Sequence, residues 1–199
     1  MFTSLLLTLL NKEASSRKSK ADEIIGHLGI KDGAAIADIG SGGGYFTLLF
    51  AGRTGNAGTV YAVDVKPDHL EFLRRSAGRA GIQNVRYILA GEGELDLPRA
   101  GLDLVFARNV YHHLPAPGDY FRTLKKFLKP DGLVAIIEHT PKSGFGFVTL
   151  FKHTTSRTTI VADMEKAGYV AVKSFDFLPR QSFILFGPAL LLAGSVGHQ

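Results

Sequence analysis

An apolar run that ends in four glycines within five residues constrains this chain more than any other feature. Residues 35–39 read Ala-Ile-Ala-Asp-Ile, and residues 40–44 read Gly-Ser-Gly-Gly-Gly. Apolar residues then recur at helical spacing through Leu48, Leu49 and Ala51. This order predicts a strand, a tight turn and the start of a helix, because glycine lets backbone approach a ligand that side chains would block. An ordinary glycine-rich turn in an α/β protein is the alternative.

The spacing of the glycines distinguishes two kinds of ligand. Glycine occupies the first, third and fifth positions of the turn, as Gly40, Gly42 and Gly44. Tyr45 occupies the sixth position, where the dinucleotide fingerprint has a glycine. A tighter turn preceded by an acid, Asp38, suits a nucleoside that carries a cationic tail and no pyrophosphate. A nicotinamide-dependent oxidoreductase, which uses the same kind of strand, loop and acid, stays as an alternative.

The composition is that of one folded domain. Of the 199 residues, 45% are hydrophobic and 21% are charged, which is typical of a globular chain. The chain has no cysteine, which excludes disulfides, thiolate zinc sites and cysteine nucleophiles. Its formal net charge is +5, but the basic residues are spread along the sequence. Nucleic acid is therefore not an expected partner.

Two apolar segments near the ends of the chain are too short to cross a bilayer. Residues 1–10 lack the basic start and the small-residue cleavage site of a signal peptide. Residues 183–194 are interrupted by a Gly-Pro pair. We expect residues 1–18 to form an amphipathic arm or lid, residues 19–199 to form a single domain, and the protein to be cytoplasmic. Contact with a membrane surface stays open.

Strands and helices are expected to alternate over the first 140 residues. Strands are expected at residues 35–39, 59–63, 85–89, 102–107 and 133–137, with helices between them. A helix over 118–128 is followed by an expected turn at 129–132. The alternation predicts a parallel sheet with right-handed crossovers. Two last strands, at 169–177 and 182–186, are joined by a short link and must pair antiparallel.

Acidic residues follow several of these strands, at the edge where open α/β sheets bind ligands. Asp64 lies one helix and one strand after the glycine turn and could accept hydrogen bonds from both hydroxyls of a ribose. A helix-capping acid before Pro67 is the alternative. Glu92 could accept from an adenine amine or be an exposed loop acid. Asp38 could offset a positive group or bind loop amides, since a buried acid needs such partners.

Six short motifs occur in an order that is shared with one enzyme family. They are residues 37–47 (ADIGSGGGYFT), 63–64 (VD), 91–93 (GEG), 102–106 (LDLVF), 109–114 (NVYHHL) and 128–132 (LKPDG). On these motifs the chain resembles the class I S-adenosylmethionine-dependent methyltransferases, close to the small-molecule subgroup that includes the quinone-biosynthesis enzymes. The resemblance covers roughly residues 20–140 and leaves out residues 1–18 and 141–155.

The resemblance implies a fold, a cofactor and a set of binding residues. The fold is α/β and Rossmann-like, with seven mostly parallel strands in the order 3-2-1-4-5-7-6, strand 7 antiparallel and helices on both faces. The cofactor is S-adenosylmethionine, with S-adenosylhomocysteine as product. The glycine turn would hold the methionine moiety, Asp64 the ribose and the Glu92 segment the adenine. The implied cofactor-binding residues are Asp38, Gly40, Ser41, Gly42, Gly44, Tyr45, Asp64, Val65, Gly91, Glu92, Gly93, Arg108 and Asn109.

The chain departs from the family pattern in two places. Members often carry aspartate where Glu92 stands and alanine where Gly93 stands, so that the adenine contact could differ. The loop after the fourth strand lacks an Asn/Asp-Pro-Pro-Tyr tetrad. Methylation of an amide or of an adenine amine by that route is therefore not expected.

Tyr111, His112 and His113 follow the fourth strand, beside the methyl group that the resemblance places there. Methyl transfer from a sulfonium is an in-line displacement, and positioning can supply most of the catalysis. A base is needed only if the acceptor carries a proton. His112 and Tyr111 are the candidate catalytic residues, with His112 as a base for a phenol or a similar acceptor. In the alternatives, His113 only packs beneath the next turn and Tyr111 only forms part of the pocket wall.

A metal site is not expected, although several candidate ligands occur. These are His112, His113, Glu138, His139 and His153. Adjacent histidines tend to point apart, and no compact ligand spacing appears.

The segments outside the motifs are expected to select the acceptor. The connection at residues 141–155 carries five large apolar side chains: Phe145, Phe147, Val148, Leu150 and Phe151. Together with residues 1–10 it would form a lid over a small, largely apolar or aromatic acceptor. Packing against a dimer partner or a membrane surface is the alternative, and the chain is expected to be a monomer or a homodimer. A noncatalytic nucleoside-binding module is a further alternative for the whole chain.

Overall fold

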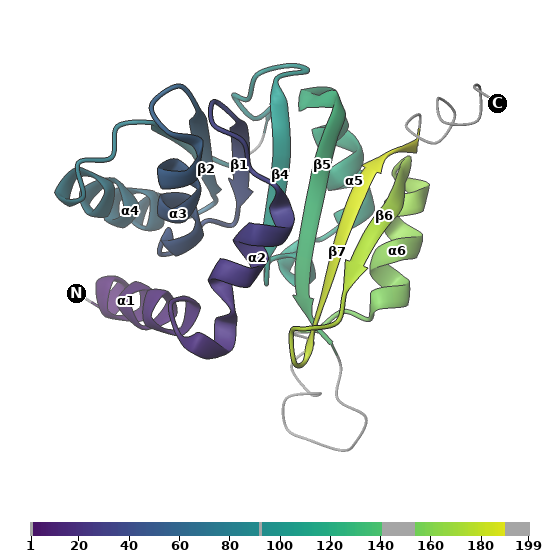
Figure 1. Ribbon diagram of the computed structural model, residues 1–199, viewed down its shortest axis with the longest axis horizontal. Coiled ribbons are helices and arrows are strands. Elements are labelled where there is room, and N and C mark those ends of the chain that lie inside the picture. The colour runs from purple at the N-terminus through teal and green to yellow at the C-terminus, as the bar shows by residue number, and fades with distance from the viewer. Residues whose placement is uncertain (1, 92, 141–153, 190–199) are drawn as a thin grey trace. The chain divides into compact units, whose positions relative to one another are not determined.

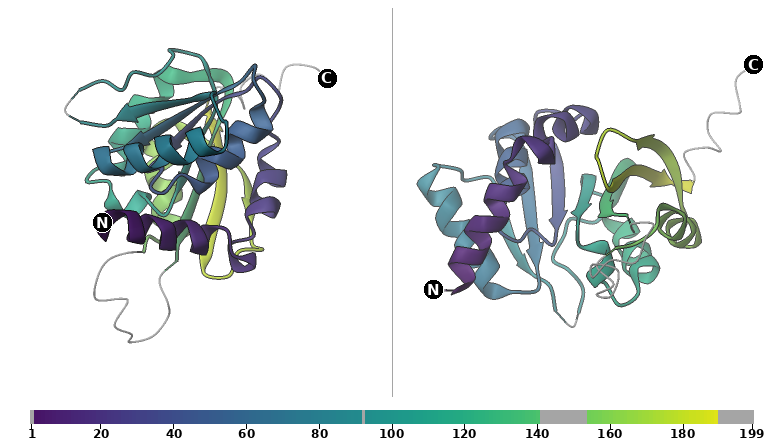
Figure 2. Two further views of the ribbon diagram at one scale, coloured as in Figure 1. Left: turned by 90° about the vertical axis from the view of Figure 1, so that its left-hand side faces the viewer. Right: turned by 90° about the horizontal axis from the view of Figure 1, so that it is seen from below.

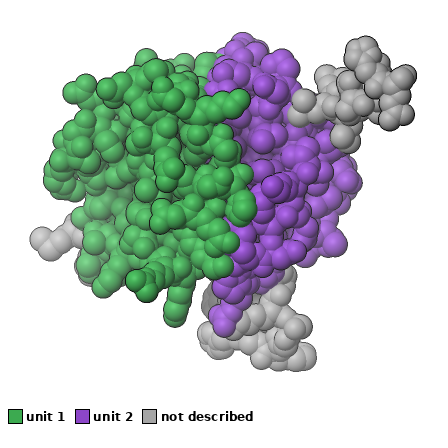
Figure 3. All heavy atoms as spheres, viewed as in Figure 1, with its two compact units in different colours: residues 1–98 green, residues 99–199 purple. Residues whose placement is uncertain are grey.

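The computed structural model describes residues 2–91, 93–140 and 154–189 (Figure 1). The chain divides into two compact units, residues 1–98 and residues 99–199, which have different colours in Figure 3. The strands form a seven-stranded sheet in the order β3-β2-β1-β4-β5-β7-β6. The predicted α/β fold and its strand order are therefore confirmed.

Helices and parallel strands alternate in the first unit (Figure 1). Its elements are α1 (Phe2–Ala14), the short 3-10 helix η1 (Arg17–Ser19), α2 (Ala21–Leu28), β1 (Ala35–Ile39), α3 (Tyr45–Thr54), β2 (Thr59–Asp64), α4 (Pro67–Arg79) and β3 (Val85–Leu89). β2 pairs in parallel with both β1 and β3. The apolar residues of β1 and β2 are almost all buried, as expected for parallel strands covered by helices.

Glycine and proline set the helix bounds in this unit. α2 ends at Leu28 and is followed by Gly29, which is left-handed with φ 60°. α4 begins at Pro67. Proline has no amide hydrogen, and this costs nothing in the first turn of a helix, where the amides have no intrahelical acceptor. Ser19 is the last residue of η1, and its hydroxyl lies at hydrogen-bond distance from the carbonyls of Ala14 and Ser16. Lys20 is the residue that precedes α2.

The expected N-terminal arm is a helix that packs on the first unit. α1 contacts α3 and α4, and it runs beside them in Figure 2. Leu7 is fully buried on the inner side of α1. The described helices include none that is long and apolar enough to cross a membrane.

The second unit contains the remaining strands and ends in a hairpin. Its elements are β4 (Leu102–Arg108), η2 (Tyr111–His113), α5 (Pro117–Leu124), η3 (Lys125–Phe127), β5 (Leu128–His139), α6 (Arg157–Lys166), β6 (Tyr169–Phe175) and β7 (Gln181–Pro188). β4 and β5 are parallel, whereas β7 pairs antiparallel with both β5 and β6. The predicted terminal hairpin is confirmed.

The turn predicted at residues 129–132 is wrong, because these residues lie within β5. Leu102 pairs with Leu128, whereas Leu104 pairs with Leu133, so the register of β4 and β5 shifts across this stretch. A Cβ atom at Gly132 would lie 2.7 Å from the Leu102 carbonyl oxygen. Glycine therefore lets the irregular stretch stay against β4. The preceding helix is also shorter than predicted, since α5 ends at Leu124.

Candidate functional site

The loop after β1, residues 40–44, has left-handed backbone at three glycines. The φ angles of Gly40, Gly42 and Gly44 are 69°, 53° and 81°. A Cβ atom at Gly44 would lie 2.1 Å from Cδ1 of Leu73, so glycine here lets the loop pack on α4. A Cβ atom at Gly42 would meet only the Gly40 carbonyl oxygen, at 3.8 Å. The backbone at Gly42 is therefore open to the approach of a ligand.

Asp64, at the carboxyl end of β2, is hydrogen-bonded to this loop. Its Oδ2 accepts a hydrogen bond of 2.9 Å from the Gly42 amide, and its Oδ1 accepts one of 3.0 Å from the Lys66 amide. The Nδ1 atom of His69 lies 3.2 Å from Oδ2 and is the donor, because an ionised carboxylate only accepts. These contacts occupy three of the carboxylate's roughly four lone-pair positions. Asp64 thus joins β2, the glycine loop and the first turn of α4.

The hydroxyl of Ser41 gives a direct test of whether this loop fits a polar ligand. It is buried and has no hydrogen-bond partner among the residues that the structure describes. Leaving a buried hydroxyl unpaired costs roughly 1–3 kcal/mol, so native structures rarely do so. A polar ligand in the glycine loop would supply the missing partner, and the residues present therefore fit the predicted cofactor.

Asp38 is buried at the base of the loop and is bound to α3. Thr47 donates its hydroxyl to Oδ2 of Asp38 over 2.5 Å. Burial raises the pKa of Asp38 to about 7, the negative charge of Asp64 adds to this, and the Thr47 hydrogen bond opposes it. The sequence allows Asp38 to bind loop amides, but in the structure the amide of Gly42 donates to Asp64.

We expect the raised pKa of Asp38 to make the first unit less stable as the pH rises. The folded-state pKa exceeds the ordinary value of 3.8, so this group's stabilisation is complete below about pH 4 and is lost as the pH approaches 7. A shift of this size corresponds to about 4 kcal/mol. In Asp38→Asn, the side-chain amide oxygen can still accept from Thr47, but the side chain cannot ionise. The loss of stability between pH 4 and pH 7 should therefore disappear. Urea unfolding followed by circular dichroism from pH 4 to pH 8 measures it.

The control for Asp38→Asn is Asp96→Asn, which removes an exposed carboxylate from the same unit. The control should have the pH dependence of the natural chain. If the free energy of unfolding has the same pH dependence in all three proteins, Asp38 ionises as an ordinary carboxyl group.

Apolar side chains are exposed beside Asp64. Val65 and Leu89 have 69% and 56% of their surface exposed. Leu89 ends β3 and pairs with Asp64 across the two strands. Neither Gly91 nor Gly93 has an atom within 4 Å of a Cβ position, so the backbone there is also open. Exposed apolar surface next to a carboxylate suits the flat ring and the sugar of a nucleoside. Glu92 lies outside the described residues.

We expect Gly42→Val to abolish cofactor binding. A branched side chain would be strained at φ 53° and would fill the open side of the loop. The strain should cost on the order of 1–3 kcal/mol, so the fold should survive. Calorimetry with S-adenosylhomocysteine, with a thermal melt as the folding control, measures both effects. Normal binding by this variant would show that the loop is only a structural turn.

In the second unit, His112 is paired with the buried carboxylate of Glu138. Oε1 of Glu138 lies 3.0 Å from Nδ1 of His112, and Oε2 accepts from the His112 amide over 3.3 Å. The amide of His139 also donates to Oε1. Because a carboxylate accepts, Nδ1 of His112 is the donor, and in the neutral ring Nε2 is then the acceptor. This is the orientation that a general base requires.

The expectation that the adjacent histidines point apart is wrong. The ring centroids of His112 and His113 are 4.0 Å apart. Both residues lie in the single turn of η2, which holds their rings on the same side. No group of three or more metal-ligating side chains occurs among the described residues.

The other strand-end residues of this unit make structural contacts. Tyr111 is buried, stacks on Phe121 and donates its hydroxyl to Asp163 over 3.1 Å. Burial, and then the charge of Asp163, raise the pKa of Tyr111. These contacts favour the alternative in which Tyr111 forms part of a wall. Asn109 has φ 55° and accepts a hydrogen bond from Gln181. Arg108 is the last residue of β4.

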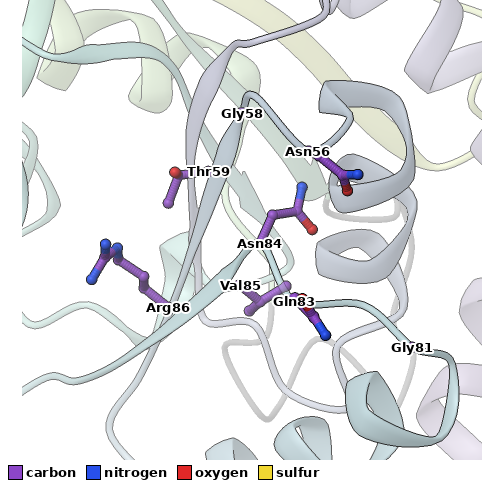
Figure 4. A pocket seen from close by; sticks show the side chains of 8 residues that line it. All are labelled: Asn56, Gly58, Thr59, Gly81, Gln83, Asn84, Val85 and Arg86. Atoms are coloured by element: carbon purple, nitrogen blue, oxygen red, sulfur yellow. The ribbon is translucent and has the colours of Figure 1, made fainter.

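A polar hollow at the amino ends of β2 and β3 is a poor candidate for the cofactor site (Figure 4). It is lined by Asn56, Gly58, Thr59, Gly81, Gln83, Asn84, Val85 and Arg86. The side-chain amide of Asn84 contacts the carbonyls of Ala51 and Gly55 and so closes the end of α3. Ligands of open α/β sheets bind at the opposite, carboxyl ends of the strands.

Three contacts of the candidate site residues were not predicted from the sequence. They are those of Asn11 with Gly43, His69 with Asp64 and Glu138 with His112. For Glu138, its position at the end of a buried strand was a usable signal, because an acid there faces the ligand-binding edge. The other two contacts have no comparable signal in the sequence.

Comparison with known proteins agrees with the glycine loop, the strand-end acid and the strand order. The family model described as "Methyltransferase domain" matches residues 30–176. The chain therefore belongs to this family of methyltransferase domains. Its resemblance to the S-adenosylmethionine-dependent methyltransferases is confirmed.

Individual relatives cover part of the chain. An uncharacterized methyltransferase of Mycobacteroides abscessus is 34% identical over 110 residues, which are 54% of this chain and 40% of the relative. The ubiquinone/menaquinone biosynthesis C-methyltransferase UbiE of Azotobacter vinelandii is 28% identical over 58% of this chain and 46% of its own length. The chain thus spans less than half of each of these two proteins.

A solved structure shares the fold over nearly the whole chain. The crystal structure of a S-adenosylmethionine-dependent methyltransferase from Aquifex aeolicus has a TM-score of 0.81 at 20% identity. The match covers 92% of this chain and 97% of that one.

Proposed function

We propose that this protein transfers a methyl group from S-adenosylmethionine to a small-molecule acceptor. The observation that carries the proposal is the arrangement around the glycine loop. Asp64 holds the open backbone of Gly42, and the buried hydroxyl of Ser41 lacks a partner among the described residues. When bound, the cofactor supplies a methyl group on a positively charged sulfur.

Residues of the first unit would hold the cofactor. Residues 40–44 would bind the methionine moiety, and Ser41 would gain its missing hydrogen bond there. Asp64 would bind the ribose, and the exposed side chains of Val65 and Leu89 would contact the adenine. Because three of the lone-pair positions of Asp64 are already occupied, His69 would have to release Oδ2 before both ribose hydroxyls could donate to the carboxylate.

His112 of the second unit would take a proton from the acceptor. In the neutral ring its Nε2 would accept this proton, and Glu138 would hold the ring and stabilise the imidazolium. An acceptor with an ionisable hydroxyl, such as a phenol, needs this base, whereas an amine without a proton does not. We therefore propose a small aromatic or otherwise apolar molecule with such a hydroxyl.

Calorimetry with S-adenosylhomocysteine and NAD tests the proposal. Saturable binding of S-adenosylhomocysteine without binding of NAD is expected. Release of S-adenosylhomocysteine is then measured with a panel of phenols, carboxylic acids and amines, and the phenols should react. Binding of NAD alone would support an oxidoreductase. Binding of S-adenosylhomocysteine without turnover of any acceptor would support a noncatalytic nucleoside-binding module.

The structure describes only one part of the proposed lid. Residues 141–153 of the predicted connection lie outside the described residues. The other part is α1, four of whose five leucines are exposed at the surface of the first unit.

A further inference from the structure

The helix α1 has an inner face that is bound to the first unit and an outer face that is apolar and exposed. On the inner face, Leu7 is fully buried and Nδ2 of Asn11 donates to the carbonyl of Gly43 over 2.7 Å. On the outer face, four leucines are exposed by 43–62%: Leu5, Leu6, Leu9 and Leu10. The inner contacts therefore fix which face of the helix is presented to the surroundings.

The four leucines form one continuous stripe. Residues three or four apart are neighbours on a helix, so Leu5 lies beside Leu9, and Leu6 beside Leu10. At about 100° per residue the set covers an arc of about 140°. A contiguous exposed apolar patch on a folded protein commonly marks an interaction surface, whereas single exposed leucines do not.

Basic side chains adjoin the stripe. Lys12 lies in the last turn of α1, and Arg17 and Lys18 lie in η1, which follows directly. All three are exposed, and none forms an ion pair with another described residue. Glu13 is the one acidic residue of α1. The surface therefore combines an apolar stripe with a local excess of positive charge.

We infer that α1 binds the surface of an anionic lipid membrane. A helix that lies in the plane of a membrane inserts an apolar face between the lipids, while lysine and arginine contact the negatively charged headgroups. The 13 residues of α1 are too few to span a bilayer, so the helix lies on the surface.

A second copy of the chain fits this face less well. A two-fold contact through the stripe with the two helices parallel would bring Lys12, Arg17 and Lys18 of both copies together, and like charges repel. Four leucines also form a small contact compared with the roughly 800 Å² that each partner buries in a stable complex. An anionic surface satisfies both the apolar stripe and the positive charges.

Sedimentation of the full chain with lipid vesicles tests the inference. Vesicles of equal parts phosphatidylcholine and phosphatidylglycerol should bind the protein, and vesicles of phosphatidylcholine alone should bind it much less. Binding should weaken as the salt concentration rises. In the double variant Leu6→Gln and Leu9→Gln, binding should fall at least tenfold. Neutralising Lys12, Arg17 or Lys18 singly as glutamine should lower it by about fivefold each.

The matched control is Val172→Gln, which replaces an exposed apolar side chain of β6, and it should bind vesicles like the natural chain. Circular dichroism of each variant verifies that α1 and the fold are retained. Vesicle binding that is absent from the natural chain, or unaffected by the leucine variant, would overturn the inference. Sedimentation velocity gives a further test. Self-association that the leucine variant abolishes, without vesicle binding, would show that a second copy covers the stripe.

Discussion

Replacing His112 with alanine is expected to slow methyl transfer to a phenolic acceptor by about 10²–10⁴-fold, the usual contribution of a general base. Glu138 holds the ring, and alanine removes the Nε2 atom that is proposed to accept the proton. The rate of S-adenosylhomocysteine formation at saturating cofactor measures the effect. The affinity for S-adenosylhomocysteine should not change, because His112 is not among the residues proposed to contact the cofactor. An unchanged rate would mean that positioning alone drives the reaction.

Two further variants separate the base from its surroundings. Glu138→Gln removes the charge that stabilises a protonated His112, and it should lower the rate while His112 stays in place. His113→Ala removes an exposed ring that contacts His112 but has no role in the proposed proton transfer. It is the matched control and should retain most of the activity. Equal losses in His113→Ala and His112→Ala would point to a structural effect on η2.

Replacing Asp64 with alanine is expected to lower the affinity for S-adenosylhomocysteine at least tenfold. Each charge-assisted hydrogen bond to the ribose contributes roughly 1.5–3 kcal/mol. The variant also loses the bond to the Gly42 amide, so the glycine loop itself is less well fixed. Calorimetry gives the affinity, and a thermal melt verifies the fold. If the affinity is unchanged, Asp64 does not belong to the cofactor site.

The control for Asp64→Ala is His69→Ala, which leaves the carboxylate in place. His69 donates to the oxygen that also binds Gly42, so its removal frees a position for a ribose hydroxyl. The affinity of this variant should be equal to that of the natural chain or higher. A large loss in His69→Ala would show that His69, and not only Asp64, contacts the cofactor.

Much of the fold follows from local signals in the sequence. Apolar runs bounded by glycine predicted β1 and β3 with their observed bounds, and α4 begins at a proline, Pro67. Gly29 likewise follows the last residue of α2. These signals act within a few residues, through the left-handed conformation of glycine and the fixed φ of proline. Such local signals can therefore be identified from the sequence alone.

The unpredicted features depend on contacts between distant residues. His112 and Glu138 are 26 positions apart, and Asn11 and Gly43 are 32 apart. The continuation of β5 through residues 129–132 likewise depends on pairing with β4. Local propensity favoured a turn there, and tertiary pairing overrode it. Which side chains meet across such distances is determined by packing, on which a local pattern gives no information.

The hydrogen bond from Asn11 to Gly43 also has a thermodynamic consequence. It makes the position of α1 and the conformation of residues 40–44 parts of one equilibrium. If attachment of the outer face to a surface favours the ligand-ready loop, the ligand must favour attachment by the same factor, since such coupling is reciprocal. The ratio of the ligand's dissociation constants with and without the surface would then give the coupling free energy. The ratio of the surface's dissociation constants with and without the ligand would give the same value.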